Sequence, residues 1–209
     1  MSLRPVPVLV GDQIMLAIDG RRRSVAPFEI YPGVTLVTGD ERMASALLRA
    51  LAGVERPAAG TVRWGQGLRR AVTTGEFSRV RTYVGTEPIE DGQLRVLDWF
   101  ALTARLWDVP DPHAAFAQRA HEWGLDPFLH RRIDTLSPGY VQRLLLAGSL
   151  VPAPAVWILD DPARRLDHDG RLLLERTLEA PGLPRPETVI LTRTAPFALP
   201  ADNVQVIVR

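Results

Sequence analysis

The chain has 209 residues, of which 46% are hydrophobic and 23% charged, so it can form one domain with a sizeable buried core. Its 25 basic residues are all arginine, since lysine occurs nowhere in the sequence, and 24 acidic residues balance them to a net charge of +1. This balance argues against a protein built mainly to bind nucleic acid, and the lack of cysteine excludes disulfides, thiolate metal sites and a cysteine nucleophile.

The sequence predicts neither an export signal nor a membrane span. The longest apolar stretch, Leu144–Leu159, is interrupted by Pro152 and Pro154 and is shorter than the roughly 20 residues that cross a bilayer. The first ten residues contain Pro5 and Pro7 and too short an apolar run for a signal peptide. We therefore expect a cytoplasmic protein that reaches a membrane only through a partner.

The chain opens with an antiparallel β pattern. Val6–Val10 and Ile14–Ile18 predict two short strands, separated by Gly11 and Asp12.

A strand, a tight turn and a helix follow in that order. Val34–Thr38 is an apolar, β-branched run that ends at Gly39, and helical spacing of apolar residues then continues from Ala44 to Leu51, before Gly53. A phosphate-binding loop would lie here, although any α/β protein can show the same periodicity.

The second half alternates helices and strands. Residues 98–150 show helical spacing broken by prolines, which predicts a mainly α insertion. The patterns that follow predict a buried strand over Ala155–Leu159, a helix over Arg171–Leu178 and a strand over Thr188–Thr192. Such alternation predicts an α/β fold with a mostly parallel core sheet and helices on its faces.

Four segments carry a more specific pattern. They are GVTLVTGDERMASALLRALAGVERPAAGTVRW (Gly33–Trp64), YVGTEP (Tyr83–Pro88), LSPGYVQRLLLAGSLVPAPAVWILDDPARRLD (Leu136–Asp167) and TVILTRTA (Thr188–Ala195). In this order they resemble the motifs of the nucleotide-binding subunits of ABC transporters. The resemblance implies one P-loop NTPase-like cassette over residues 1–209, with an N-terminal antiparallel β subdomain, a core over about 1–85 and 151–209, and a helical subdomain over about 86–150.

The phosphate-binding loop departs from the family pattern G-x-x-x-x-G-K-[ST], whose lysine reaches the β- and γ-phosphates. This chain has no lysine, is about one residue short, and reads Gly39, Asp40, Glu41, Arg42, Met43, Ala44, Ser45. Asp40 and Glu41 place carboxylates at a helix N-terminus, where free N–H groups would otherwise hold phosphate. We predict a self-capped turn that binds no triphosphate. The alternatives are Arg42 in place of the lysine and Ser45 as a magnesium ligand.

The Walker B position is better preserved. Val156–Leu159 is the apolar strand, and by resemblance Asp160 stands at the magnesium position and Asp161 at that of the catalytic glutamate. An aspartate there is one methylene short, and adjacent carboxylates after a strand are also common helix caps. Thr86 and Arg193 stand where the resemblance implies the Q-loop glutamine and the switch histidine. We expect no catalytic residue, and only a vestigial metal position at Asp160.

Two further features of a nucleotide or metal site are missing from the pattern. The region Ile14–Arg23 contains no aromatic residue that could stack on adenine. The histidines fall in no metal-ligand or triad spacing; they are His113, His121, His130 and His168.

The signature motif retains what a partner cassette would need. In the family, two cassettes pair head to tail, so Ser137 could offer its hydroxyl and Gly139 its N–H to ATP held by a partner. Tyr140 replaces the usual glutamine, and Gln142 follows within the same motif. The alternative for Ser137 is a plain N-cap of the following helix.

The preferred interpretation is a catalytically degenerate cassette, a pseudo-ATPase, that acts as a structural or regulatory half of an ABC transporter. By resemblance its partners are membrane-spanning subunits and an intact cassette, or a second copy, with no nucleic acid. By the same resemblance we expect no cofactor in its own site, and magnesium-ATP only where a partner cassette holds it. Arg164, Arg165 and Asp167 form its D-loop, and the two arginines are candidates for the cassette interface.

By the same resemblance, the segment around Trp99, Phe100 and Trp107 forms a groove for a helix of the membrane subunit, although such aromatics can equally be core. Two alternative functions stay open. One is a working but atypical ATPase that uses Arg42, and the other is a soluble cassette-like interaction module without a transporter.

Overall fold

The computed structural model describes residues 6–179, 186–194 and 199. Nine strands are assigned in this part of the chain: β1 Leu9–Ile18, β2 Arg21–Ser24, β3 Phe28–Ile30, β4 Gly33–Leu36, β5 Ala59–Trp64, β6 Arg70–Ala71, β7 Arg81–Val84, β8 Val156–Leu159 and β9 Thr188–Leu191. The α-helices of the same part are α1 Glu41–Leu51, α2 Gly75–Ser78, α3 Val96–Leu106, α4 Pro112–Glu122, α5 Pro138–Leu150 and α6 His168–Glu179. Three 3₁₀ turns, at Gln66–Leu68, Asp126–Phe128 and Ile133–Thr135, complete the assignment.

The N-terminal sheet is antiparallel, as expected, and is built around β1, which pairs with β2, β3 and β5. The prediction of two strands separated at Gly11 and Asp12 was wrong, because one strand runs from Leu9 to Ile18. Its register with β5 shifts between Asp12 and Met15, and Gln13 takes a positive φ of 50°. A bulge therefore absorbs the residues that looked like a turn.

The second sheet has the order β4-β9-β8-β7, and all its strand pairs are parallel. β8 and β9 are buried along their whole length, which explains their continuous apolar, β-branched sequences. The mostly parallel core predicted from the alternation of helices and strands is confirmed.

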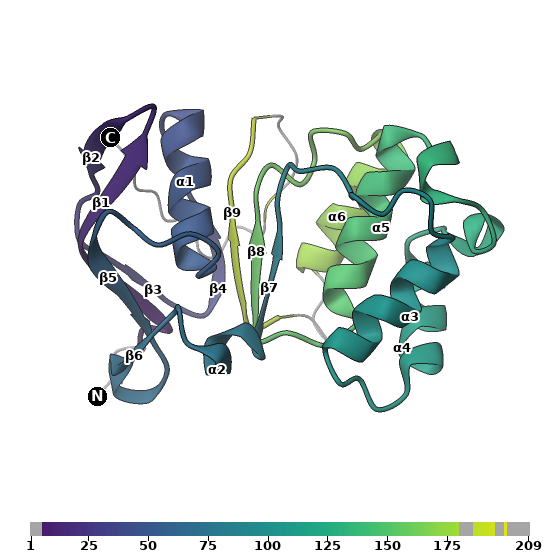
Figure 1. Cartoon of the computed structure of the whole chain (residues 1–209), viewed down its shortest axis with the longest axis horizontal. Coiled ribbons are helices and arrows are strands. Elements are labelled where there is room, and N and C mark those ends of the chain that lie inside the picture. The colour runs from purple at the N-terminus through teal and green to yellow at the C-terminus, as the bar shows by residue number, and fades with distance from the viewer. Residues whose placement is uncertain (1–5, 180–185, 195–198, 200–209) are drawn as a thin grey trace.

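Two apolar clusters lie on the two faces of the parallel sheet (Figure 1). One joins α1 to the antiparallel sheet, on the left of the view, and the other joins α3, α4, α5 and α6, on the right. Neighbouring residues of β8 belong to different clusters: Ile158 packs with α1 and the antiparallel sheet, and Trp157 packs with the helices on the other face. The parallel sheet thus separates the phosphate-loop helix α1 from the signature helix α5.

The predicted helices exist, with shifted ends. The helical region consists of three helices, α3, α4 and α5. The break expected at the prolines falls between α3 and α4, and α4 begins with Pro112, which can occupy the first turn. α5 starts at Pro138, because Ser137 caps it. α6 starts at His168, three residues earlier than expected.

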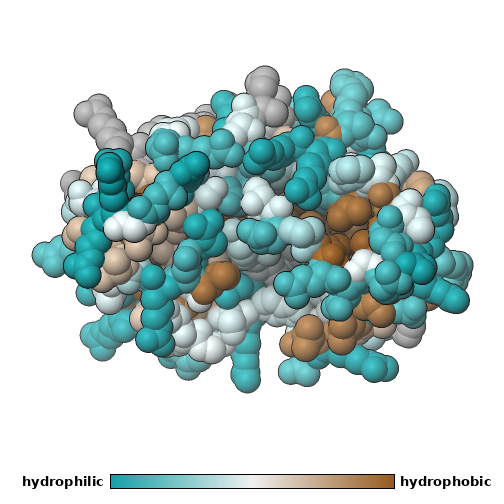
Figure 2. Space-filling model, turned by 45° about the horizontal axis from the view of Figure 1, so that its top comes forward, coloured by the Kyte–Doolittle hydropathy of each residue, from teal (hydrophilic) through white to brown (hydrophobic). Residues whose placement is uncertain are grey.

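Apolar side chains are distributed unevenly over the surface. Figure 2 shows that the most hydrophobic ones on that face gather on the right, over the half of the molecule that the helices form. Leu102 and Leu106 of α3 are both exposed, the latter to 76%. Among the described residues, no helix has the length and apolar character needed to cross a membrane.

Candidate functional site

The turn before α1 is capped by its own carboxylate. Gly39 has a φ of 137°, a value that favours glycine, and Asp40 then acts as the N-cap. The Asp40 side chain accepts a hydrogen bond of 3.0 Å from the backbone N–H of Met43. This N–H is one of the unpaired donors that a phosphate group would otherwise use. The geometry agrees with the expected self-capped turn.

Ser45, in the first turns of α1, lies against the end of β8. Its Oγ donates a hydrogen bond of 2.8 Å to Oδ1 of Asp160, whose residue is only 2% exposed. A hydroxyl and a carboxylate side by side are oxygen ligands of the kind that Mg²⁺ takes in phosphate-binding loops. The pair therefore fits a magnesium ion, and the structure joins residues that are 115 positions apart.

The position of Ser45 also identifies the residue that replaces the lysine. In the pattern G-K-[ST] the lysine directly precedes the hydroxyl residue, and here that residue is Ala44, which is 3% exposed. A methyl group cannot neutralise phosphate charge. The loop therefore offers no cation at this position, whereas the neighbouring pair of oxygens fits a metal ion.

The remaining charged residues of the loop are paired within the chain. Glu41 accepts a hydrogen bond of 3.3 Å from Arg164 of the D-loop. Arg42 forms an ion pair with Asp19, in the turn between β1 and β2. Both pairs are exposed, so each contributes little to stability. They nevertheless direct the Arg42 guanidinium toward the hairpin, and they bring Arg164 to the loop.

A pocket of about 610 Å³ lies between the β1–β2 hairpin and the start of α1. Its lining includes Arg21, Arg23 and Arg42 as cations and Asp19 and Asp40 as anions. None of its described lining residues is aromatic, in agreement with the sequence. A base in this pocket would therefore find no ring to stack on.

Asp161 is turned away from solvent and fixed by the segment after β9. It has a positive φ of 48° and is 4% exposed. Its Oδ1 and Oδ2 accept hydrogen bonds from the N–H and the hydroxyl of Thr194, at 3.1 and 2.5 Å. The carboxylate thus holds two donors of its own chain, which explains why the unfavourable backbone conformation is tolerated.

Thr192 and Thr194 are the residues of this site that sequence reasoning missed. The Thr192 hydroxyl donates to Asp160 and accepts from the N–H of Asp161, at 2.8 and 2.9 Å. The TRT sequence directly after the last core strand could have indicated these two hydroxyls. Parallel strands end at the same edge of a sheet, so these hydroxyls had to lie near the two aspartates.

The Q-loop and switch positions lie near the D-loop and near Asp161. The carbonyl oxygen of Thr86 accepts a hydrogen bond of 3.3 Å from Arg165. Arg193 is exposed and lies between the two threonines that hold the aspartates. Neither position supplies a side chain of the type that the family uses there.

The signature residues form the start of α5. Ser137 is its N-cap and accepts a long hydrogen bond of 3.4 Å from the N–H of Tyr140. The Tyr140 ring packs against the ring of Phe128 in a tilted arrangement, with centroids 4.2 Å apart. A Cβ on Gly139 would lie 3.1 Å from the carbonyl oxygen of Arg165, so glycine allows the signature to contact the D-loop closely. Gln142 is buried within the helix packing.

The D-loop is also tied to α5 through a buried arginine. Arg143, whose side chain is 7% exposed, donates a hydrogen bond to Asp167, and the N–H of Gly170 donates to the same oxygen at 2.9 Å. The hydrogen bond from Arg143, followed by that from Gly170, lowers the pKa of Asp167 below its ordinary value.

The aromatic residues expected in a docking groove are divided between core and surface. Phe100 is 1% exposed and packs on the rings of Trp99 and Phe116. Trp99 also covers Gly148 of α5, whereas Trp107 is half-buried at the end of α3.

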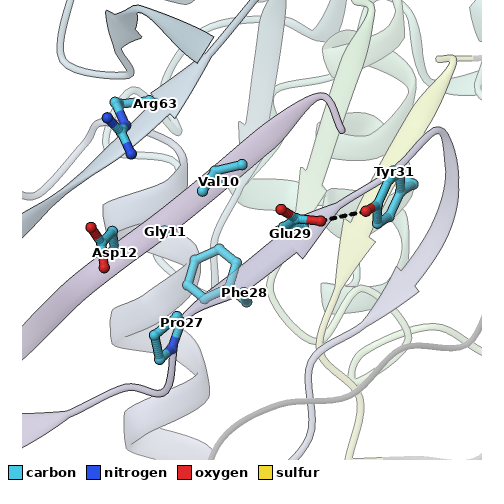
Figure 3. A pocket seen from close by; sticks show the side chains of 8 residues that line it. All are labelled: Val10, Gly11, Asp12, Pro27, Phe28, Glu29, Tyr31 and Arg63. Carbon is cyan, nitrogen blue, oxygen red and sulfur yellow. Dashed lines mark hydrogen bonds between the residues drawn. The ribbon is translucent and has the colours of Figure 1, made fainter. Parts of the chain in front are cut away.

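Another hollow, of about 700 Å³, lies on the antiparallel sheet (Figure 3). Phe28 covers Gly11 there, while Asp12, Glu29 and Arg63 contribute charges. It brings together none of the residues expected in a nucleotide site. Among the described residues, no group of three or more His, Asp or Glu side chains could hold a metal ion by itself.

Comparison with known proteins identifies the family. The family model described as "ABC transporter" matches residues 44–164, more than half of the chain. The chain belongs to the ABC transporter family. This ABC cassette is 34% identical over 161 residues to the cytochrome c biogenesis ATP-binding export protein CcmA of Pseudomonas aeruginosa, covering 75% of this chain and 78% of the relative.

Other relatives of this cassette carry different names. The zinc import ATP-binding protein ZnuC of Cereibacter sphaeroides is 34% identical over 156 residues, which cover 75% of this chain and 57% of the relative. Among solved structures, cbiO1 of Clostridium perfringens, described as part of the ABC transporter complex cbiONQ, is similar with a TM-score of 0.67 and 17% identity. That similarity covers 90% of this chain and 78% of the other, and it supports the cassette fold.

Proposed function

We propose that this cassette is a pseudo-ATPase that serves as a structural or regulatory half of an ABC transporter. The observation that carries the proposal is the start of α1, where Ala44 precedes Ser45 and the Asp40 carboxylate holds the N–H of Met43. A triphosphate bound here would lack its lysine and would face a fixed negative charge.

Electrostatics support the same conclusion. Two like charges about 4 Å apart repel by about 1 kcal/mol in water and by about 4 kcal/mol near a protein surface with an effective dielectric constant of 20. Arg42 compensates little, since its guanidinium is paired with Asp19. The match to the family also begins only at residue 44, so the earlier residues of the loop lie outside it.

The proposed partners follow from what the chain retains. In a head-to-tail pair, Ser137 and Gly139 would close over ATP held by an intact cassette, while the site built on Gly39–Ser45 stays without nucleotide. Leu102 and Leu106, exposed on α3, offer apolar contact to a membrane-spanning subunit. Through such a subunit the chain would lie at the cytoplasmic face of a membrane.

One observation favours a second candidate, an atypical but working ATPase. The hydrogen bond between Ser45 and Asp160 preserves a pair of magnesium ligands that a fully degenerate loop would not need.

Calorimetry with magnesium-ATP separates the two candidates. For the purified chain we expect no saturable binding at micromolar ATP, because the loop lacks a cation at Ala44. The quadruple variant Asp40→Gly, Glu41→Gly, Met43→Gly, Ala44→Lys supplies the glycine and the lysine that precede the hydroxyl residue in the family pattern and removes both carboxylates, so it should gain magnesium-dependent binding. Micromolar binding by the unaltered chain, lost in Asp160→Asn, would contradict the proposal and favour the working ATPase.

The regulatory role is tested in the assembled complex. Neighbouring gene products are co-purified with this chain, and ATP hydrolysis is measured for the complex with either the unaltered chain or Tyr140→Gln. We expect an intact cassette and a membrane subunit to co-purify, and the variant, which restores the usual signature residue, to raise hydrolysis several-fold. A chain that purifies alone would favour the soluble interaction module.

A further inference from the structure

Another pocket lies at the opposite edge of the parallel sheet from Asp160. It has a volume of about 640 Å³, and it is lined by Ser78, Arg79, Arg81, Leu106, Trp107 and Asp108. Arg81 begins β7 and lies opposite Val156, the first residue of β8, so the pocket lies at the amino ends of the strands. Figure 1 shows α2 and the start of β7 together at the lower edge of the molecule.

Arg81 is an unusual cation for this position. It is half-buried, and burial lowers its pKa with no nearby carboxylate to oppose the effect. Its Nε is fully buried and has no hydrogen-bond partner within residues 6–179, 186–194 and 199. A guanidinium that is partly withdrawn from water without a counter-ion is costly, and proteins normally pair it.

Arg79, two residues earlier, brings a second guanidinium to the same pocket. It is exposed and, in the described part of the chain, forms no ion pair. Asp108 also lines the pocket, so the two arginines and this one carboxylate give the lining a net charge of +1. Two guanidiniums and one carboxylate therefore favour an anion here.

We propose that this pocket binds a phosphate monoester. A carboxylate has two oxygens, which one guanidinium satisfies, whereas a phosphoryl group has three and suits the two planar forks of Arg79 and Arg81. The volume exceeds that of a phosphate alone and lies in the range of small-molecule sites. The half-buried ring of Trp107 provides an apolar wall for the organic part of the ligand.

Calorimetry on the full chain at constant ionic strength tests the proposal, with inorganic phosphate and glycerol 3-phosphate as probes. Both should bind at one shared site, with glycerol 3-phosphate the tighter of the two. Arg81→Gln and Arg79→Gln should each weaken binding about tenfold, the loss expected for hydrogen bonds to a charged group. Arg56→Gln, which removes an exposed arginine outside the pocket, should change nothing.

Thermal unfolding and two further binding measurements distinguish loss of the site from loss of the fold. Arg81→Gln should fold normally and melt at the same or a higher temperature without phosphate, because it removes an unpaired buried charge. Equal binding by Arg81→Gln, or loss of binding in Arg42→Gln instead, would place the anion elsewhere and overturn the proposal. Acetate binding as tightly as phosphate would overturn the assignment to a phosphoryl group.

Discussion

The hydroxyl of Thr192 joins the two aspartates that end β8. It donates to Asp160 and accepts from the N–H of Asp161, and the whole group is buried. Replacing this hydroxyl by a methyl group keeps the shape of the side chain but leaves a buried donor and a buried carboxylate oxygen each with one partner fewer. At this site the hydrogen bonds, more than apolar packing, fix the aspartates.

We predict that Thr192→Val lowers the free energy of unfolding by about 1–3 kcal/mol, the cost of leaving a buried polar group unsatisfied. Urea denaturation measures this change in the free energy of unfolding. Thr188→Val is the matched control, because the Thr188 hydroxyl is buried and lacks a hydrogen-bond partner among the described residues. That variant should be as stable as the parent chain or more so. Equal losses of stability in both variants would mean that side-chain packing, and not the hydrogen bonds of Thr192, causes the effect.

These contacts show which part of the site the sequence could predict. The loop sequence alone predicted the cap at Asp40, because an N-cap is a local pattern. The partnership of Ser45 with Asp160 spans 115 residues, and no local pattern reports it. The roles of Thr192 and Thr194 likewise depend on two parallel strands ending at the same edge. The sequence therefore predicted the local cap but not the long-range hydrogen bonds between polar side chains.

At the scale of elements, β1 shows the corresponding limit for the fold. The apolar, β-branched runs were sufficient to predict the buried parallel strands, whose sequence follows from burial on both faces. In β1, Gly11 and Asp12 carry the composition of a turn, yet they lie inside the strand. Pairing with three neighbouring strands overrides that local preference, and only the tertiary structure reveals it.

Gly11 is required where β1 meets β3. It pairs with Phe28, and a Cβ on Gly11 would lie 2.2–2.9 Å from three atoms of the Phe28 ring (Figure 3). We predict that Gly11→Ala destabilises the protein by about 1–3 kcal/mol, because the ring must leave its place. Thermal unfolding should show that the double variant Gly11→Ala, Phe28→Leu loses less stability than the two single variants lose together. Gly75→Ala, where a Cβ meets no atom within 4 Å, should be neutral.

The start of α6 depends on Asp167. This carboxylate accepts from the N–H of Gly170 and from the buried Arg143, so it caps the helix and neutralises the arginine. We predict a loss of about 2–4 kcal/mol for Asp167→Ala, of which about 1 kcal/mol is the cap. Asp167→Asn should lose less, since its amide oxygen still caps the helix. Chemical denaturation at neutral pH measures both variants.

The pH dependence of the same variants provides a check. The pKa of Asp167 is lowered in the folded chain, so its charge stabilises the fold above the ordinary pKa of about 4 and ceases to do so as the pH falls below it. The difference between the parent chain and Asp167→Asn should therefore shrink at acidic pH. A constant difference from pH 7 to pH 3 would show that the charge has no role.

On the scale of the whole molecule, the exclusive use of arginine sets the response to alkali. Lysine ordinarily loses its charge near pH 10.4, but this chain has no lysine and no cysteine. Arginine keeps its charge in that range. Between pH 9 and 12 the change in side-chain charge therefore comes mainly from the three tyrosines, so the titration of one buried phenol can be observed without interference from lysine or cysteine.

Tyr83, in β7, is that phenol. Burial, with the negative Asp160 nearby, raises the pKa of Tyr83 to about 12 from an ordinary value of 10. The unfolded chain therefore releases this proton first, so the stabilisation is complete below pH 10 and is lost as the pH rises toward 12. We predict a loss of about 1–2 kcal/mol, less than the full shift implies because the ring is only half-buried.

Urea denaturation of the parent chain and of Tyr83→Phe, at intervals from pH 9 to pH 12, measures this loss. The variant has no phenol at this position, so its stability should decline less over the interval, and the two curves should converge or cross above pH 10. Absorbance at alkaline pH should show one tyrosine fewer ionising near pH 12 in the variant. Parallel curves across the whole interval would mean that Tyr83 titrates alike in the folded and unfolded chains.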